Sequence, residues 1–101
     1  MNAILIDPIK QLAEMISISD LNDVVDVIGH DTLEQDSVGD DGDRIYFDEN
    51  CFVRGTEGRF KIDSLVPLAG NGVLVGTDDD GATLRNVAIS LEDLRSRIRY
   101  L

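Results

Sequence analysis

Residues 32–48, TLEQDSVGDDGDRIYFD, decide the fold of this chain. Polar and apolar side chains alternate over 32–38, the segment GDDGD at 39–43 interrupts the pattern, and alternation resumes over 44–48. Alternation with a period of two is typical of a β-strand with one buried face, and Gly with Asp favours a tight reversal. The stretch therefore predicts a β-hairpin with an acidic turn.

More strands are predicted on the C-terminal side of this hairpin. Reversals at Asn50 and over 55–58 divide the next stretch into two short segments, CFVR at 51–54 and RFKI at 59–62. Residues 73–76 (VLVG) are apolar and rich in valine, which is typical of a strand in the centre of a sheet. Residues 65–71 contain Pro and Gly and are not expected to hold a long strand. The strands predicted on this side lie at 51–54, 59–62, 73–76 and 82–87.

On the N-terminal side, residues 3–6 (AILI) form a short apolar run that ends at Asp7 and Pro8, because proline lacks a backbone donor and fixes φ. This run predicts a buried strand. Residues 10–18 are ambiguous, because their apolar positions fit a helical stripe while 14–18 alternate with a period of two. We predict a strand, because a helix so close to Pro8 would have to end immediately before the next helix.

Two segments show the three- and four-residue spacing of a helix with one buried face. The first helix is predicted at 20–28, where Asp20 is placed to cap the N-terminus and Gly29 follows the last turn. The second is predicted at 90–99, and its stripe is expected to pack on the chain's own sheet. The stripes consist of Leu21, Val24, Val25 and Ile28, and of Leu91, Leu94, Ile98 and Leu101. The expected architecture is a single α+β domain over 1–101, with a mainly antiparallel sheet built from hairpins and a meander.

Charge is distributed unevenly along the chain. Residues 1–50 contain 13 Asp and Glu against Lys10 and Arg44, whereas 51–101 contain seven residues of each sign. The whole net charge of −11 therefore lies on the first half. Affinity for phosphates comes from Lys and Arg, so direct binding to nucleic acid or to an anionic membrane surface is not expected. A basic protein is the expected partner of the acidic half.

Composition and cysteine content indicate a globular protein of the cytoplasm. The chain is 43% apolar and 29% charged, as folded proteins are. Cys51 is the only cysteine, which excludes the intramolecular disulfides on which small secreted domains rely. The apolar run near the N-terminus is shorter than an export signal requires, and no stretch approaches the roughly 20 apolar residues of a membrane span.

The chain carries no recognisable catalytic, cofactor or metal motif, and we assign no residue to any of these roles. The Asp-rich turns do not fit the EF-hand loop in a frame set by Gly42 or by Gly81. Cys51 and His30 have no spacing that supports a nucleophile pair, and Cys51 is expected to be a core residue in a strand. The glycines near residue 72 precede a strand, whereas phosphate-binding loops precede a helix.

Several short motifs follow one another along the chain. They are ILIDP at 4–8, IG at 28–29, DTLE at 31–34, IYFDE at 45–49, Phe60, PLAGNG at 67–72, VG at 75–76 and DG at 80–81. Their order resembles that of domain-of-unknown-function family 3846, a family of short uncharacterised proteins from phages, prophages and bacterial genomes. The resemblance spans nearly the whole chain and implies no activity, cofactor or catalytic residue. The acidic segment 34–43 departs from the family pattern and leaves the length of the hairpin open.

Two functions are compatible with these observations. The first is a non-enzymatic accessory or interaction protein of phage or mobile-element type, a monomer or weak homodimer that uses its acidic half to bind a basic protein. The alternative is a small-ligand-binding or enzymatic domain with a site near 67–76, where glycines permit close backbone approach. The candidate partner-binding residues are Asp20, Asp23, Asp26, Glu34, Asp36, Asp40, Asp41 and Asp43.

Overall fold

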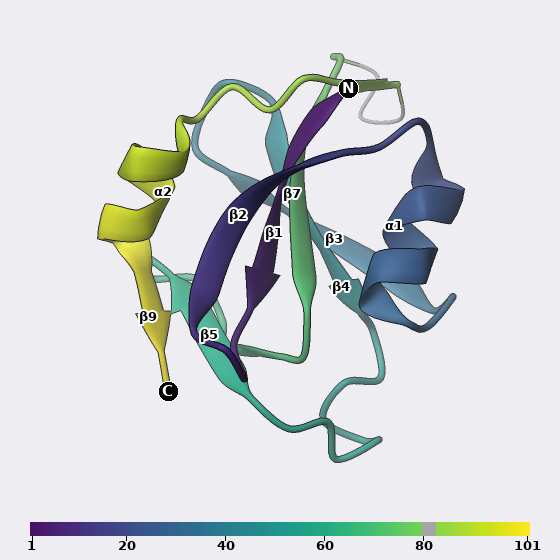
Figure 1. The fold of residues 1–101 in the computed structure, drawn as a ribbon, viewed down its shortest axis with the longest axis vertical. Helices are drawn as coiled ribbons and strands as arrows, with labels where there is room; N and C mark the ends of the chain where they lie inside the picture. Colours follow the sequence, from purple (N-terminus) through teal and green to yellow (C-terminus); the bar gives the residue numbers. More distant parts are fainter. Residues whose placement is uncertain (80–82) are drawn as a thin grey trace.

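The computed structural model describes residues 1–79 and 83–101 and has the predicted α+β fold, with strands paired antiparallel (Figure 1). The elements in chain order are β1 (Asn2–Asp7), β2 (Leu12–Ser17), α1 (Leu21–Ile28), β3 (Leu33–Val38), β4 (Asp43–Asp48), β5 (Arg59–Ile62), β6 (Leu68–Ala69), β7 (Gly72–Thr77), β8 (Leu84–Arg85), α2 (Leu91–Arg97) and β9 (Ile98–Tyr100). No helix among the described residues is long and apolar enough to cross a bilayer.

The main sheet has the strand order β2-β1-β7-β4-β3, and β8 pairs with one end of β7. The hairpin predicted over 32–48 is confirmed as β3 and β4, in a register that pairs Val38 with Asp43 and Leu33 with Asp48. The ambiguous segment 10–18 contains β2, which pairs with β1 as a second hairpin. The two hairpins do not pair with each other, because β7 lies between β1 and β4.

Both faces of this sheet are covered by apolar clusters, and successive side chains of β7 belong to one cluster or the other. Val73 and Val75 pack in one apolar cluster with Val24 of α1, while Leu74 belongs to the cluster on the opposite face. α1 and α2 accordingly flank the sheet from opposite sides (Figure 1). Because β7 is covered on both faces, all six of its residues are buried, as expected for the VLVG segment.

A three-stranded sheet with the order β6-β5-β9 covers the second face together with α2. Phe60 and Ile62 of β5 and Leu94 of α2 are almost fully buried there. The prediction that the last helix packs on the chain's own core is therefore correct for Leu94, and Leu91 and Ile98 also pack against this cluster. Leu101, the last member of the predicted stripe, is 62% exposed.

Three predicted elements need correction. The segment 51–54 is a series of turns, because the Arg54 N–H donates to the Asn50 carbonyl and the chain reverses before it can extend. The second helix ends at Arg97 rather than at 99, because the following residues pair with β5 as β9. Within the described part of 82–87, the strand covers only Leu84–Arg85, and residue 82 lies outside the described residues.

Candidate functional site

The predicted partner-binding acids lie in two places, α1 with its cap and the β3–β4 hairpin, and one of them is buried. On α1 and its cap, Asp20 and Asp26 are exposed and Asp23 is half-buried. On the β3–β4 hairpin, Glu34, Asp36, Asp40 and Asp41 are exposed, whereas Asp43 is 3% exposed.

The acids of α1 have a structural role at the helix start. The Asp20 carboxylate accepts hydrogen bonds from the N–H groups of Asn22 at 2.9 Å and Asp23 at 3.3 Å. Asp23 in turn accepts from the Ser19 N–H at 2.7 Å. These reciprocal bonds satisfy N–H groups that a helix leaves unpaired at its N-terminus. Two of the three acids are therefore partly occupied, and Asp26 has no such bond among the described residues.

Asp43 does not belong to the partner surface, which corrects the prediction. Its carboxylate accepts hydrogen bonds from the N–H groups of Ala88 at 2.8 Å and Ile89 at 2.9 Å. The sequence suggested a turn residue, but Asp43 is the first residue of β4 and its side chain holds the segment that leads into α2. Both oxygens are thus occupied by backbone donors of the protein itself.

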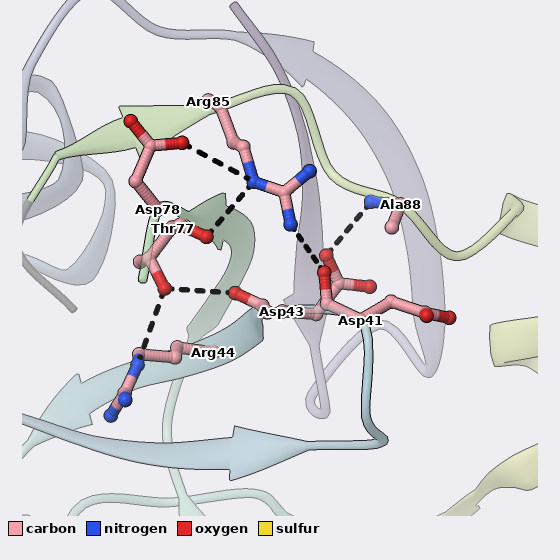
Figure 2. A network of polar contacts seen from close by, with 8 residues as sticks. Asp41, Asp43, Arg44, Thr77, Asp78, Arg85 and Ala88 are labelled. Carbon is pink, nitrogen blue, oxygen red and sulfur yellow. Dashed lines mark hydrogen bonds and ion pairs between the residues drawn. The ribbon is translucent and has the colours of Figure 1, made fainter. Parts of the chain in front are cut away.

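Asp43 lies next to a network of polar contacts that joins the hairpin turn to β7 and β8 (Figure 2). The Gly42 carbonyl accepts from the Thr77 N–H at 2.8 Å and from the Thr77 hydroxyl at 2.9 Å. Arg85 donates to the Thr77 carbonyl at 2.9 Å and to the Asp41 carbonyl, and its Nε lies 3.7 Å from an Asp78 carboxylate oxygen. Backbone carbonyls accept most of these bonds, so the network fixes the turn.

A second buried carboxylate, Asp48, anchors the loop after β4. It accepts from the Thr32 hydroxyl at 2.5 Å, from the Asn50 N–H at 3.0 Å and from Arg54 Nε at 2.8 Å. Burial alone would raise the pKa of Asp48, but these hydrogen bonds and the guanidinium charge outweigh it and lower the pKa below its usual value. This bond holds Arg54 close to the end of β4, in keeping with the turns at 51–54.

The outer edge of β3 lies between the C-terminal end of α1 and the acidic turn of the hairpin. Leu33 at its start packs in the same cluster as Val27 and Ile28 of α1, and Val38 at its end leads into the acidic turn. Six residues of strand span roughly 20 Å. β3 is the last strand of the main sheet, and within the described residues it pairs with β4 alone. Its outer edge therefore runs from the C-terminal end of α1 to the acidic turn.

The hydrogen-bonding groups at this edge can be assigned from the register. The Glu49 N–H donates to the Thr32 carbonyl at 2.7 Å, so the alternation of an antiparallel ladder turns the backbone groups of residues 33, 35 and 37 away from β4. The Gln35 N–H confirms this direction, because it donates to the side chain of its neighbour Glu34 at 3.0 Å. Among the described residues, no other chain segment forms a ladder with this edge.

The alternative site near 67–76 has a packing explanation. A Cβ at Gly72 would lie 2.8 Å from the Phe60 ring, and one at Gly76 would lie 2.3 Å from the Asn86 carbonyl oxygen. These glycines let neighbouring parts of the chain approach each other. Two depressions on the described surface, of about 460 Å³ beside the start of α1 and about 370 Å³ beside the end of α2, include no residue of 67–76.

Cys51 is buried, as predicted, although it lies in a turn and not in a strand. The described residues contain no group of three or more His, Cys, Asp or Glu side chains arranged to hold a metal ion. Comparison of the chain with models of known families, with curated proteins and with solved structures finds no match.

Proposed function

We propose that this chain is a non-enzymatic accessory protein of phage or mobile-element type that binds a basic protein in the cytoplasm through its acidic first half. The observation that carries the proposal is the outer edge of β3, a six-residue strand that no second neighbouring strand pairs with among the described residues and that has exposed acids along it. An exposed edge of this kind accepts an added strand from a partner, and the acids select a basic one.

The register of β3 specifies what the partner strand should look like. The backbone groups of residues 33, 35 and 37 would form hydrogen bonds with the partner strand. The side chains of Glu34 and Asp36 would lie next to the partner side chains that are directly opposite them. In such pairs the Cβ atoms lie about 4.5–5.5 Å apart, so opposite charges attract. A segment with Lys or Arg at every second position fits this edge, and Asp40 and Asp41 extend the negative surface beyond its end.

The same acids oppose pairing of two copies of this chain. An antiparallel pair of β3 strands centred on Gln35 would place Glu34 of each copy opposite Asp36 of the other. Like charges directly opposite each other destabilise a sheet. The edge is thus suited to a different protein rather than to a second copy, consistent with a monomer or a weak homodimer.

The test uses a synthetic extended peptide that alternates Lys with Val and Thr, labelled for fluorescence anisotropy. We expect binding that weakens at least tenfold between 50 and 300 mM salt, because screening reduces the attraction. The double variant Glu34→Gln with Asp36→Asn should weaken binding at least tenfold. A control with the same charge change, Glu14→Gln with Glu57→Gln, removes exposed acids elsewhere and should retain it.

A second variant separates the strand edge from the charge alone. Ser37→Pro removes an outward N–H while leaving the charges and the ladder with β4 in place, and proline is tolerated on edge strands. We expect it to abolish peptide binding with an unchanged circular dichroism spectrum. Equal binding by the acidic double variant and its control, or full binding by folded Ser37→Pro, would overturn the proposed edge.

A further inference from the structure

The outer face of the three-stranded sheet collects positive charge on a chain with a large surplus of acids. Along β5, Arg59 and Lys61 alternate with the buried Phe60 and Ile62, so the two basic side chains share the outward face. On β9, Arg99 lies between two residues that pack against the core. The chain has 20 acids and nine Lys and Arg, so a face on which cations adjoin cations is unexpected.

Two of these cations oppose each other directly. Lys61 of β5 and Arg99 of β9 are cross-strand partners in the antiparallel ladder. Like charges in this position destabilise a sheet. Among residues 1–79 and 83–101, neither side chain makes a hydrogen bond or ion pair. The fold therefore holds two unneutralised positive charges side by side.

A depression of about 370 Å³ lies beside this pair, and residues of β5, of the turn after it, of the end of α2 and of β9 line it. Its lining also includes Arg97 and Asp63, which form an ion pair of their own: Arg97 Nε lies 2.9 and 3.1 Å from the two Asp63 carboxylate oxygens. These hydrogen bonds lower the pKa of Asp63 and pair its charge with that of Arg97, which the carboxylates of Asp93 and Asp43 also attract from farther away. Lys61 and Arg99 are left as two net positive charges on the depression.

We propose that this depression binds a phosphate monoester group of a small ligand. The dianionic form of phosphate would neutralise both cations, and its oxygens match the planar donor fork of arginine and the point charge of lysine. The Ser64 hydroxyl lines the same depression and supplies a further polar group. A nucleic-acid strand is a poor candidate, because the net charge of −11 repels a long polyanion whereas one phosphate group meets only the local field. The inference is independent of the basic partner proposed for β3.

The test is a titration of the isotope-labelled full chain with inorganic phosphate at low salt, followed by two-dimensional NMR. We expect saturable shifts of the amides of 61–64 and 96–99, and weaker effects from acetate at the same concentration. A sugar phosphate and a phosphoserine peptide are titrated separately. Tighter binding of the sugar phosphate supports a small ligand, whereas tighter binding of the peptide overturns that part of the inference.

Variants assign the site. Lys61→Gln and Arg99→Gln should each weaken phosphate binding at least fivefold, and Arg99→Lys, which keeps the charge, should retain most of it. Lys10→Gln is the matched control, because it removes an exposed charge that does not line the depression. Lys61→Gln and Arg99→Gln should also leave the melting temperature in phosphate-free buffer unchanged or raised, because each relieves repulsion between the two cations.

Two results would refute the inference. One is a wild-type chain whose amides at 61–64 and 96–99 show no saturable response to phosphate. The other is a loss of affinity in Lys10→Gln equal to that in Lys61→Gln, which would mean that the affinity for phosphate depends only on the net charge of the protein. The peptide-binding experiment on β3 is unaffected by either result, so the two proposals fail separately.

Discussion

Replacement of Asp43 by asparagine tests whether this buried acid holds the fold together. The carboxylate accepts two backbone N–H groups, from Ala88 and Ile89, at 2.8 and 2.9 Å. Asparagine has nearly the same shape but only one acceptor oxygen, so one N–H would face the amide NH₂ and lose its partner. A hydrogen bond to a charged group contributes about 1.5–3 kcal/mol, and an unsatisfied buried donor costs about 1–3 kcal/mol.

We therefore expect Asp43→Asn to lower the free energy of unfolding by about 2–3 kcal/mol. Domains of this size are stable by about 5–15 kcal/mol, so the loss is substantial. At roughly 4–8 °C per kcal/mol for a chain of about 100 residues, the melting temperature should fall by at least about 8 °C. Urea denaturation at neutral pH, followed by circular dichroism, measures the free energy directly.

The matched control is Asp36→Asn, which makes the same chemical change in the same hairpin at an exposed carboxylate. Surface substitutions of this kind usually change stability by less than about 0.5 kcal/mol. If the two variants unfold at the same urea concentration, the Asp43 carboxylate does not stabilise the segment before α2, and the argument from its burial is wrong.

Three further predictions follow from the core and from the buried acid of the β4 loop. The folded-state pKa of Asp48 is lowered, so its contribution to stability is complete above about pH 4, the unfolded-state value, and is lost as pH falls through the folded-state pKa. Asp48→Asn should therefore flatten the decline in stability below pH 4, measured by urea denaturation at pH 6 and pH 3; an equally steep decline would contradict this. Leu94→Ala should cost about 2–5 kcal/mol because Leu94 is fully buried, whereas Leu101→Ala should cost less than about 0.5 kcal/mol; similar melting temperatures would disprove the assignment. Gly76→Ala should cost at least about 1–3 kcal/mol because the new Cβ would meet the Asn86 backbone oxygen, and a variant that melts with the wild type would argue against that approach.

Local patterns predicted the elements whose partners lie nearby in the chain. The hairpin over 32–48 and the helix over 20–28 carry their turn and cap residues within the segment, and both are found as β3–β4 and α1. The strand in 10–18 required an argument about Pro8 and is confirmed as β2. In each of these elements, short-range sterics and hydrogen bonding favour the structure that the tertiary fold also requires.

Three details that depend on side-chain contacts or on tertiary pairing were predicted wrongly. The segment 51–54 has the apolar run of a short strand, but Arg54 reaches back to the buried Asp48 six residues earlier and the chain turns. The helical stripe that ends at Leu101 is interrupted because β9 pairs with β5, about 40 residues earlier in the chain. Asp43 looked like its exposed neighbours in the turn, and only the position of the segment before α2 distinguishes it. No local signal in the sequence identifies these partners.

The candidate surfaces were predicted only in part. The uneven charge identified the acids along β3, but only the sheet order shows that this strand is at an edge. The paired cations Lys61 and Arg99 were hidden in a half of the chain whose charges cancel, because their proximity depends on the β5–β9 register. The sequence signal for half of this basic face is in β5, where two basic residues alternate with two buried apolar residues.

The position of β7 between the two hairpins affects how the chain must assemble. During synthesis, β1–β2 and β3–β4 leave the ribosome first, but no sheet joins them until residues 72–77 arrive. Until then, the edges of β1 and β4 that will pair with β7 are unpaired, and unpaired strand edges favour aggregation of nascent chains. Mutual repulsion between the acidic first halves of neighbouring nascent chains should reduce such encounters. Refolding is accordingly expected in milliseconds to seconds, limited by the entry of β7.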